Sequence, residues 1–446
     1  MIKHSLLLCI ATLVLSVGAV CQPLNRGKLD SLFDILERKD LAWASIAISK
    51  NGKVVYKRTT GAARIEGDKR IPATENTTYR IGSITKMFTA VMIYQLVEEK
   101  KLSLNDSLST YFPQMPGAGN ITLHQLLSHR SGLADYTKDG HYAEWMDKPQ
   151  TQNELLTRIV NGKRDFEPGT QADYNNSNYL LLGYIIEKVC RKPYREVLQQ
   201  RIISKLKLSK TYYANITKLN PDESDSYKYV NSQWQADKRA TPDNFGGAGA
   251  IISNPNDLTR FIEALFAGKL ISKTSLATMT TLTDSYGAGI FPYTFEGYQG
   301  LGHGGKTEGF GATLIYYPKE KLTLAYCTNG EVYPKADIQN DALKIYFNKP
   351  FTVPTFQPIT LNDAELNAYP GTYTSEQFGI TIVCTRVGNT LELETRGMKM
   401  PLDALANNKF MNTSFGFFFT FNKEKQELVI QDVDDTYYLK KQKKSE

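Results

Sequence analysis

The alternation of apolar and polar positions predicts strands on either side of a long helix-rich segment. Predicted strands cover residues 43–49, 54–56, 311–317 and 322–327. Predicted helices cover residues 28–38, 87–97 and 335–347. Asn51-Gly52 supplies a hairpin turn between the first two strands. The helix over 87–97 is apolar on nearly every side, which predicts burial between layers. With a helix-rich stretch over 100–240, the pattern indicates an α+β domain that carries an all-helical lobe.

Pro350, Pro354 and Pro358 lie close together in a stretch that we interpret as a linker. The sequence pattern differs on its two sides. Beyond it, segments with a period of two predict strands at residues 380–384, 391–393, 415–421 and 428–430. We therefore expect a small all-β domain, barrel-like, at the C-terminus. The expected divisions of the chain are a targeting segment at 1–21, a main domain at 22–349, a linker at 350–362 and the β-rich domain at 363–446.

The N-terminus has the pattern of a secretory signal peptide. Lys3 and His4 precede an apolar run over residues 6–15, and small residues at 16–19 suit cleavage. Because the run is too short to cross a bilayer stably, we expect an exported protein, periplasmic or extracellular. A lipid anchor on Cys21 is the weaker alternative, since Val20 is a poor fit to the small residue that usually precedes such a cysteine.

Composition and charge argue against several classes of function. The chain has 446 residues and a net charge of +7, with its basic residues dispersed except in the terminal run over 440–444. A solvated tail explains that run better than nucleic-acid binding does. The five histidines and five cysteines have no metal-ligand spacing, so we expect neither a metal site nor a cofactor.

Ser83 and Lys86 form the first candidate catalytic pair. They lie three residues apart at the predicted start of the buried helix, where two side chains share one face and can touch. Serine is a poor nucleophile unless a base lies within hydrogen-bond reach, and Lys86 supplies one. The spacing alone is a weak signal, because Ser204 and Lys207 share it on a lysine-rich surface. On this segment alone, a plain N-cap role for Ser83 is an equal alternative.

Two further segments place polar or small residues beside apolar elements. Tyr174 and Asn176 lie in a turn that leads into an apolar helix; a phenol can pass protons and a carboxamide can bind an amide. Residues 302–310 form a glycine-rich approach to the strand over 311–317. Small residues there would let a substrate backbone lie close to the sheet edge.

These three segments, in this order, resemble the serine β-lactamase and penicillin-binding-protein superfamily, and its class C β-lactamase-like branch most of all. The likeness covers residues 29–347 and is supported by the segments at 102–106, 121–133 and 246–249. The resemblance implies a β-lactamase/transpeptidase-like fold: an antiparallel sheet flanked by helices, with an all-helical lobe beside the active-site cleft.

The resemblance also implies roles for single residues. Ser83 matches the family's nucleophile, Lys86 the partner that abstracts its proton, and Tyr174 the tyrosine that relays protons. Asn176 matches the amide that holds the acyl side of the substrate.

The chain departs from the family pattern at the strand triplet. His303, Gly304 and Gly305 stand where the family has Lys-Thr-Gly, and the backbone N–H groups of Ser83 and Lys306 would then form the oxyanion hole. A register shifted onto Lys306 is less favoured, because a glutamate follows where the triplet needs glycine. Since the ordinary histidine pKa is ~6.5, affinity for carboxylate-bearing substrates is expected to rise as the pH falls toward 6.

We therefore expect an exported serine hydrolase that forms an acyl-enzyme on small peptide, amide or ester substrates, including ones derived from peptidoglycan. D,D-peptidase, D-aminopeptidase and esterase activities are all open at this stage. The general base is open too, because Lys86 or Tyr174 would need a pKa about three below its ordinary value to act at pH 7. The alternative is a catalytically weak module that binds peptidoglycan or a partner.

Overall fold

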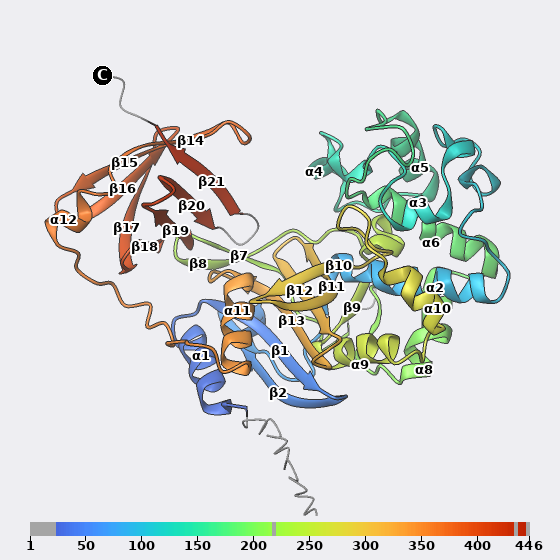
Figure 1. The fold of residues 1–446 in the computed structure, drawn as a ribbon, viewed down its shortest axis with the longest axis horizontal. Coiled ribbons are helices and arrows are strands. Elements are labelled where there is room, and N and C mark those ends of the chain that lie inside the picture. Colours follow the sequence, from blue (N-terminus) through green and yellow to red (C-terminus); the bar gives the residue numbers. More distant parts are fainter. Residues whose placement is uncertain (1–23, 216–219, 432–435, 443–446) are drawn as a thin grey trace, which may run out of the picture.

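A six-stranded antiparallel sheet forms the centre of the computed structural model, which describes residues 24–215, 220–431 and 436–442 (Figure 1). Its strands follow the order β10-β11-β12-β13-β1-β2. Their bounds are Ala42–Lys50 (β1), Lys53–Thr60 (β2), Phe291–Phe295 (β10), Tyr298–Thr307 (β11), Phe310–Tyr317 (β12) and Leu322–Glu331 (β13). The first two strands therefore complete a sheet whose other four strands come from much later in the chain. The predicted targeting segment at 1–21 lies outside the described residues.

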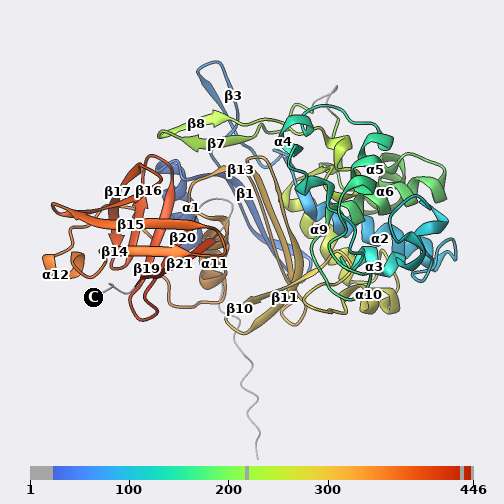
Figure 2. The ribbon, with the colours of Figure 1, turned by 90° about the horizontal axis from the view of Figure 1, so that it is seen from above.

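Helices cover both faces of this sheet, as Figure 2 shows with the sheet nearly edge-on. Helices α1 (Arg26–Arg38) and α11 (Lys335–Tyr346) share a core cluster with the outer face. Helices α2 (Thr85–Glu98) and α9 (Pro255–Phe266) pack on the opposite face. Phe88 of α2 stacks on Phe261 of α9 with ring centroids 3.7 Å apart. Helix α2 is buried from Thr85 to Leu96, which confirms the prediction of a helix between layers.

The predicted helical lobe is confirmed and lies at the opposite end of the molecule from the C-terminal strands (Figure 1). Its helices are Leu123–Leu127 (α3), Tyr142–Trp145 (α4), Gln152–Asn161 (α5), Asn176–Cys190 (α6), Tyr194–Leu198 (α7) and Ser204–Leu206 (α8). Helix α10 (Lys273–Thr280) follows α9. Among the described residues, three short sheets lie outside the central sheet: Ala62–Glu66 (β3) with Lys69–Pro72 (β4), Tyr79–Arg80 (β5) with Ile251–Ser253 (β9) and Tyr212–Tyr213 (β6), and Tyr227–Val230 (β7) with Gln233–Ala236 (β8).

The C-terminal strands form a closed barrel, which confirms the prediction of a small all-β unit. Its strands are Gly371–Ser375 (β14), Ile380–Val387 (β15), Thr390–Thr395 (β16), Met398–Ala406 (β17), Lys409–Asn412 (β18), Phe417–Asn422 (β19), Glu427–Gln431 (β20) and Thr436–Lys441 (β21). The barrel closes because β14 pairs with both β15 and β21. Residues 351–362, inside the predicted linker, have neither helix nor strand and lead into α12 (Asp363–Leu366). Phe418 of the barrel packs on Tyr333 with ring centroids 5.3 Å apart.

One local expectation needs correction. The local pattern of the glycine-rich segment at residues 302–310 predicts an approach to a strand, but residues 302–307 belong to strand β11 itself. Glycine is disfavoured in strands unless a neighbour comes very close. That condition holds at Gly302, where a Cβ would lie 1.9 Å from the carbonyl oxygen of Leu314 on the next strand.

None of the helices among the described residues combines the length and apolar character needed to span a membrane.

Candidate active site

Ser83 lies in a 3₁₀ turn, Gly82–Ile84, between strand β5 and the buried helix α2. Gly82 has a φ of +48°, and a Cβ there would lie 2.7 Å from the backbone nitrogen of Lys306. Only glycine fits this turn without strain, because both the conformation and the close strand disfavour a side chain. The turn therefore places Ser83 against the end of strand β11, with its side chain partly exposed.

The amine of Lys86 is fully buried and has three oxygen partners. Its Nζ lies 2.9 Å from Ser83 Oγ, 2.9 Å from Asn176 Oδ1 and 3.0 Å from the carbonyl oxygen of Ala248. The carbonyl can only accept a hydrogen bond, and so can the amide oxygen of Asn176. A neutral amine has two N–H donors and one lone pair. When Lys86 is neutral, its two protons go to these acceptors and its lone pair faces the hydroxyl of Ser83.

Burial favours that neutral form. Desolvation lowers the pKa of Lys86 to about 7, and the negative charge of Asp135 acts in the opposite direction. At neutral pH a large fraction of Lys86 is therefore unprotonated and can accept a proton.

Tyr174 reaches Ser83 from the segment before helix α6. Its hydroxyl donates to Ser83 Oγ at 2.6 Å, and its ring packs on His129 with centroids 4.6 Å apart. Burial raises the pKa of Tyr174 above its ordinary value. The phenol consequently stays protonated over the neutral range and faces the serine as a hydrogen-bond donor.

Asn176, the first residue of α6, is held with a defined orientation. Its Nδ2 donates to Thr137 Oγ1 at 2.9 Å and to Asp135 Oδ2 at 3.2 Å, which leaves its oxygen toward Lys86. Sequence reasoning missed Asp135 and Thr137. The available signal was their position directly after the family-like segment at 121–133, together with the N-cap preference of aspartate.

Strand β11 carries the other predicted site residues, His303, Gly304, Gly305 and Lys306. Strand β10 pairs with β11 only as far as Gly302, so the turn of Ser83 approaches the remaining edge. A Cβ on Gly305 would lie 1.9 Å from the carbonyl oxygen of Ile81 and 3.1 Å from the nitrogen of Ser83. The backbones at Ser83 and Lys306 are thereby brought side by side.

His303 differs from its expected behaviour. Its ring is buried, and Nδ1 contacts the carbonyl oxygen of Gly304, so Nδ1 carries the proton. Burial, reinforced by the charge of Lys86, lowers the pKa of His303 to about 3. The expectation that His303 titrates near pH 6 is therefore wrong, because a glycine-rich sequence context does not reveal that the ring is desolvated.

All eight predicted site residues lie together at one site. Seven of them line a cleft of about 660 Å³, and Lys86 lies directly behind Ser83. The cleft has aromatic and apolar walls, supplied by Tyr142, Met146, Phe245, Phe291 and Tyr293. A hydroxyl beside a buried amine and a protonated phenol, with the backbones of Ser83 and Lys306 side by side, is an arrangement suited to acyl transfer.

Comparison with known proteins agrees with this chemistry. The family model described as beta-lactamase matches residues 32–347. Penicillin-binding protein 4* of Bacillus subtilis (strain 168) is 28% identical over 405 residues, covering 84% of this chain and 88% of that protein. A teichoic acid D-alanine hydrolase of Staphylococcus aureus is 29% identical over 316 residues, covering 69% of this chain and 75% of its own length. A D-stereospecific amidohydrolase from Streptomyces sp. superposes with a TM-score of 0.62 at 26% identity, covering 72% of this chain and 98% of that one.

Proposed function

The chain belongs to the β-lactamase family of serine hydrolases, and on that premise we propose that Ser83 is its nucleophile, with Lys86 as general base and Tyr174 as proton donor. The observation that carries the proposal is the convergence of Lys86 Nζ and the Tyr174 hydroxyl on Ser83 Oγ, at 2.9 Å and 2.6 Å.

In the first step, neutral Lys86 takes the proton of Ser83 while Oγ attacks the substrate carbonyl. The lone pair of Lys86 has the right direction, since its two protons are held by Asn176 and Ala248. Of the two candidate bases, Tyr174 is the poorer, because burial moves the pKa of its hydroxyl away from neutrality. The negative oxygen that forms on the carbonyl is stabilised by the backbone N–H groups of Ser83 and Lys306.

In the second step, the tetrahedral intermediate collapses and the bond to the leaving amine or alcohol breaks. The leaving atom takes a proton from Tyr174, and the resulting phenolate takes one from protonated Lys86, so that both groups return to their starting states. Water then attacks the acyl-enzyme with Lys86 again as base, which releases the acid and restores the serine. The balance is one water consumed for each amide or ester bond cleaved.

For the substrate, we propose amides, peptides or esters that carry a D-amino acid, as D,D-peptidase, D-aminopeptidase or esterase substrates do. Two comparisons support this class, a D-alanine hydrolase and a D-stereospecific amidohydrolase. β-Lactam hydrolysis is the less favoured activity, because His303 is neutral where the family's lysine would attract the β-lactam carboxylate.

Turnover of a panel tests the proposal: D-amino-acid amides, muropeptides, a β-lactam and a p-nitrophenyl ester. The wild-type protein is expected to release p-nitrophenol and to hydrolyse at least one D-amino-acid substrate, and Ser83→Ala to hydrolyse none. If neither protein turns over any member, the alternative of a non-catalytic module that binds peptidoglycan or a partner is favoured instead.

Export is a further part of the proposal. It rests on the signal-like pattern at 1–21, and fractionation of the producing cell tests it. Mature protein that begins near residue 20 to 22, outside the cytoplasm, is the expected result; an intact N-terminus in the cytoplasm contradicts it. Labelled fatty acid on Cys21 would identify the lipid-anchored alternative.

A further inference from the structure

Asp135 is a buried carboxylate behind the cleft wall, where it contacts Thr137 and Asn176, two residues that line the cleft. It is 7% exposed and precedes the 3₁₀ turn Tyr136–Lys138 as its N-cap. Oδ1 accepts from the backbone N–H and the hydroxyl of Thr137, at 2.9 Å and 2.8 Å. Oδ2 accepts from the backbone N–H and the Nδ2 of Asn176, at 3.0 Å and 3.2 Å. Both oxygens act only as acceptors, the pattern of an ionised carboxylate.

These contacts determine which end of the Asn176 amide faces Lys86. The carboxylate of Asp135 and the hydroxyl of Thr137 hold the NH₂ end, so the oxygen end accepts from Lys86 at 2.9 Å. If the amide were reversed, two donors would face each other at Lys86 and two acceptors at Asp135. Because such mismatched buried groups are costly, one orientation is strongly preferred.

The same carboxylate supplies charge to the site. The titratable groups that face Lys86 are Asp135, His129, His303, Tyr174 and Tyr179. Burial lowers the pKa of both histidines and raises the pKa of both tyrosines, so these four are neutral around pH 7. Of these groups, Asp135 alone is charged there, and its charge favours the protonated form of Lys86.

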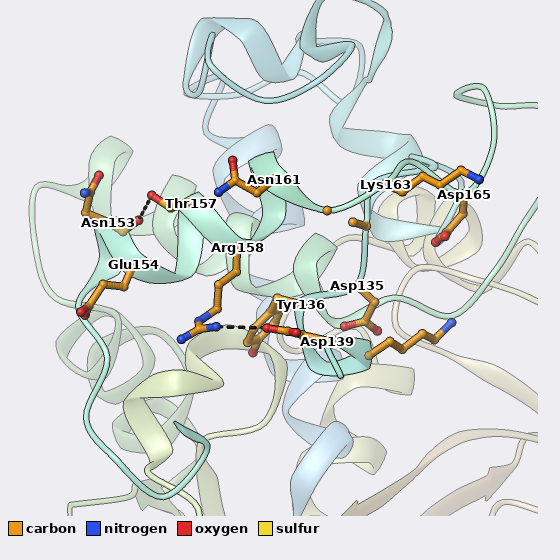
Figure 3. Close-up of a pocket in the computed structure, with 13 residues that line it drawn as sticks. Asp135, Tyr136, Asp139, Asn153, Glu154, Thr157, Arg158, Asn161, Lys163 and Asp165 are labelled. Carbon is orange, nitrogen blue, oxygen red and sulfur yellow. Dashed lines mark hydrogen bonds and ion pairs between the residues drawn. The ribbon is translucent and has the colours of Figure 1, made fainter. Parts of the chain in front are cut away.

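Other ionisable groups also interact with Asp135. The groups that interact electrostatically with it, besides Lys86, are Lys138, Asp165, Tyr136, Tyr142 and Tyr174. Asp135 and Lys138 also line a second cavity of about 640 Å³ with residues of helix α5, and Figure 3 shows the carboxylate of Asp135 there. Lys138, the cation of this segment, pairs with Asp173 at 2.9 Å and not with Asp135.

We propose that Asp135 is a positioning residue of the active site, which fixes the Asn176 amide with its oxygen toward Lys86 and supplies the buried negative charge that Lys86 faces. It does not touch the reacting atoms and acts through Asn176 and the field at Lys86. The inference rests on the proposed role of Lys86 as base.

The rate of serine labelling by a fluorophosphonate, measured from pH 5 to 9, tests the proposal. Asp135→Asn removes the charge but keeps an N-cap side chain, so it should fold. Its labelling midpoint is expected to move toward acid by about one pH unit, the effect of losing one nearby opposite charge, with a lower plateau. Thr137→Val, the matched control, loses an acceptor for Asn176 without loss of charge, so its plateau should fall while its midpoint stays.

Asp135→Glu is the second variant and should return the midpoint toward the wild-type value, because it restores the charge. An unchanged midpoint in folded Asp135→Asn, or the same shift in Thr137→Val, overturns the proposal. If Asp135→Asn does not fold, Asp135→Ser decides: it keeps an N-cap hydroxyl without the charge, so its midpoint must move toward acid by a similar amount. Failure of the wild-type protein to label at all would instead refute the proposed function, so the two failures are distinguishable.

Discussion

The hydroxyl of Tyr174 lies 2.6 Å from Ser83 Oγ, although the two residues are 91 positions apart in the chain. Ser83 comes from the turn at the central sheet, and Tyr174 comes from the segment that leads into α6 of the helical lobe. The site is therefore assembled by the packing of the lobe against the sheet.

The first prediction concerns pH. Lys86 accepts a proton only when it is neutral, and burial lowers its pKa to about 7. The acylation rate should therefore fall about tenfold for each pH unit below 7 and level off above pH 8. Stopped-flow measurement of p-nitrophenol release checks this. A rate that is flat from pH 5 to 8 would exclude Lys86 as the base.

Tyr174→Phe removes the hydroxyl that donates to Ser83 and leaves the ring packed on His129. We expect kcat to fall about 100-fold or more, the usual contribution of a proton-transfer group. Tyr179→Phe is the matched control: Tyr179 packs on the same His129 ring, but its hydroxyl donates to the carbonyl of Leu127. The control should lose ~1–3 kcal/mol of stability and keep most of its kcat. Equal kcat losses in the two variants would remove the special role of Tyr174.

Substitution by alanine should have different effects on stability and kcat at the neighbouring glycines Gly304 and Gly305 of strand β11. A Cβ at Gly305 would lie 1.9 Å from the carbonyl oxygen of Ile81, whereas one at Gly304 would lie 3.3 Å from the Tyr293 hydroxyl. Gly305→Ala must push the strand away from the turn of Ser83, so we expect a loss of ~1–3 kcal/mol or more in stability and at least a tenfold loss of kcat. Gly304→Ala should be milder in both. Thermal unfolding and steady-state kinetics of the two variants check this. Larger losses of stability and kcat in Gly304→Ala than in Gly305→Ala would contradict the proposed oxyanion hole.

His303 should not act as a pH switch. Because burial lowers its pKa to about 3, it stays neutral from pH 5 to 8 and cannot gain charge there. Affinity for a carboxylate-bearing inhibitor should therefore show no rise that depends on His303 over that range. Titration of the wild-type protein and of His303→Gln by calorimetry should give parallel pH profiles; a rise toward pH 6 in the wild type alone would contradict the buried, neutral ring.

Local patterns were enough to predict part of this molecule. The spacing of Ser83 and Lys86 places both side chains on one helical turn, and the apolar character of α2 predicted the burial of that helix between layers. The position of Tyr174 could not come from periodicity, because contact across the lobe is a tertiary property. It followed only from the ordered resemblance to a known superfamily.

Other features had no signal in a single sequence. The role of Asp135 depends on four hydrogen bonds. Two of them exist only because the turn Tyr136–Lys138 packs against the start of α6. The pKa of His303 depends on desolvation by side chains such as Phe291, which lies 4.7 Å away between ring centroids. The local pattern did not reveal strand β11, which only the resemblance implied at His303, because its glycines are explained by neighbours such as Leu314 that only the folded sheet brings close.

The most direct test of the central claim is the site of covalent modification. The protein is treated with a fluorophosphonate at pH 8 and digested, and the modified peptide is sequenced by mass spectrometry. We predict a single adduct on Ser83 in the wild type and none in Ser83→Ala, with both proteins unfolding at similar temperatures. An adduct on another residue, or equal labelling of the alanine variant, would contradict the assignment of Ser83 as the nucleophile.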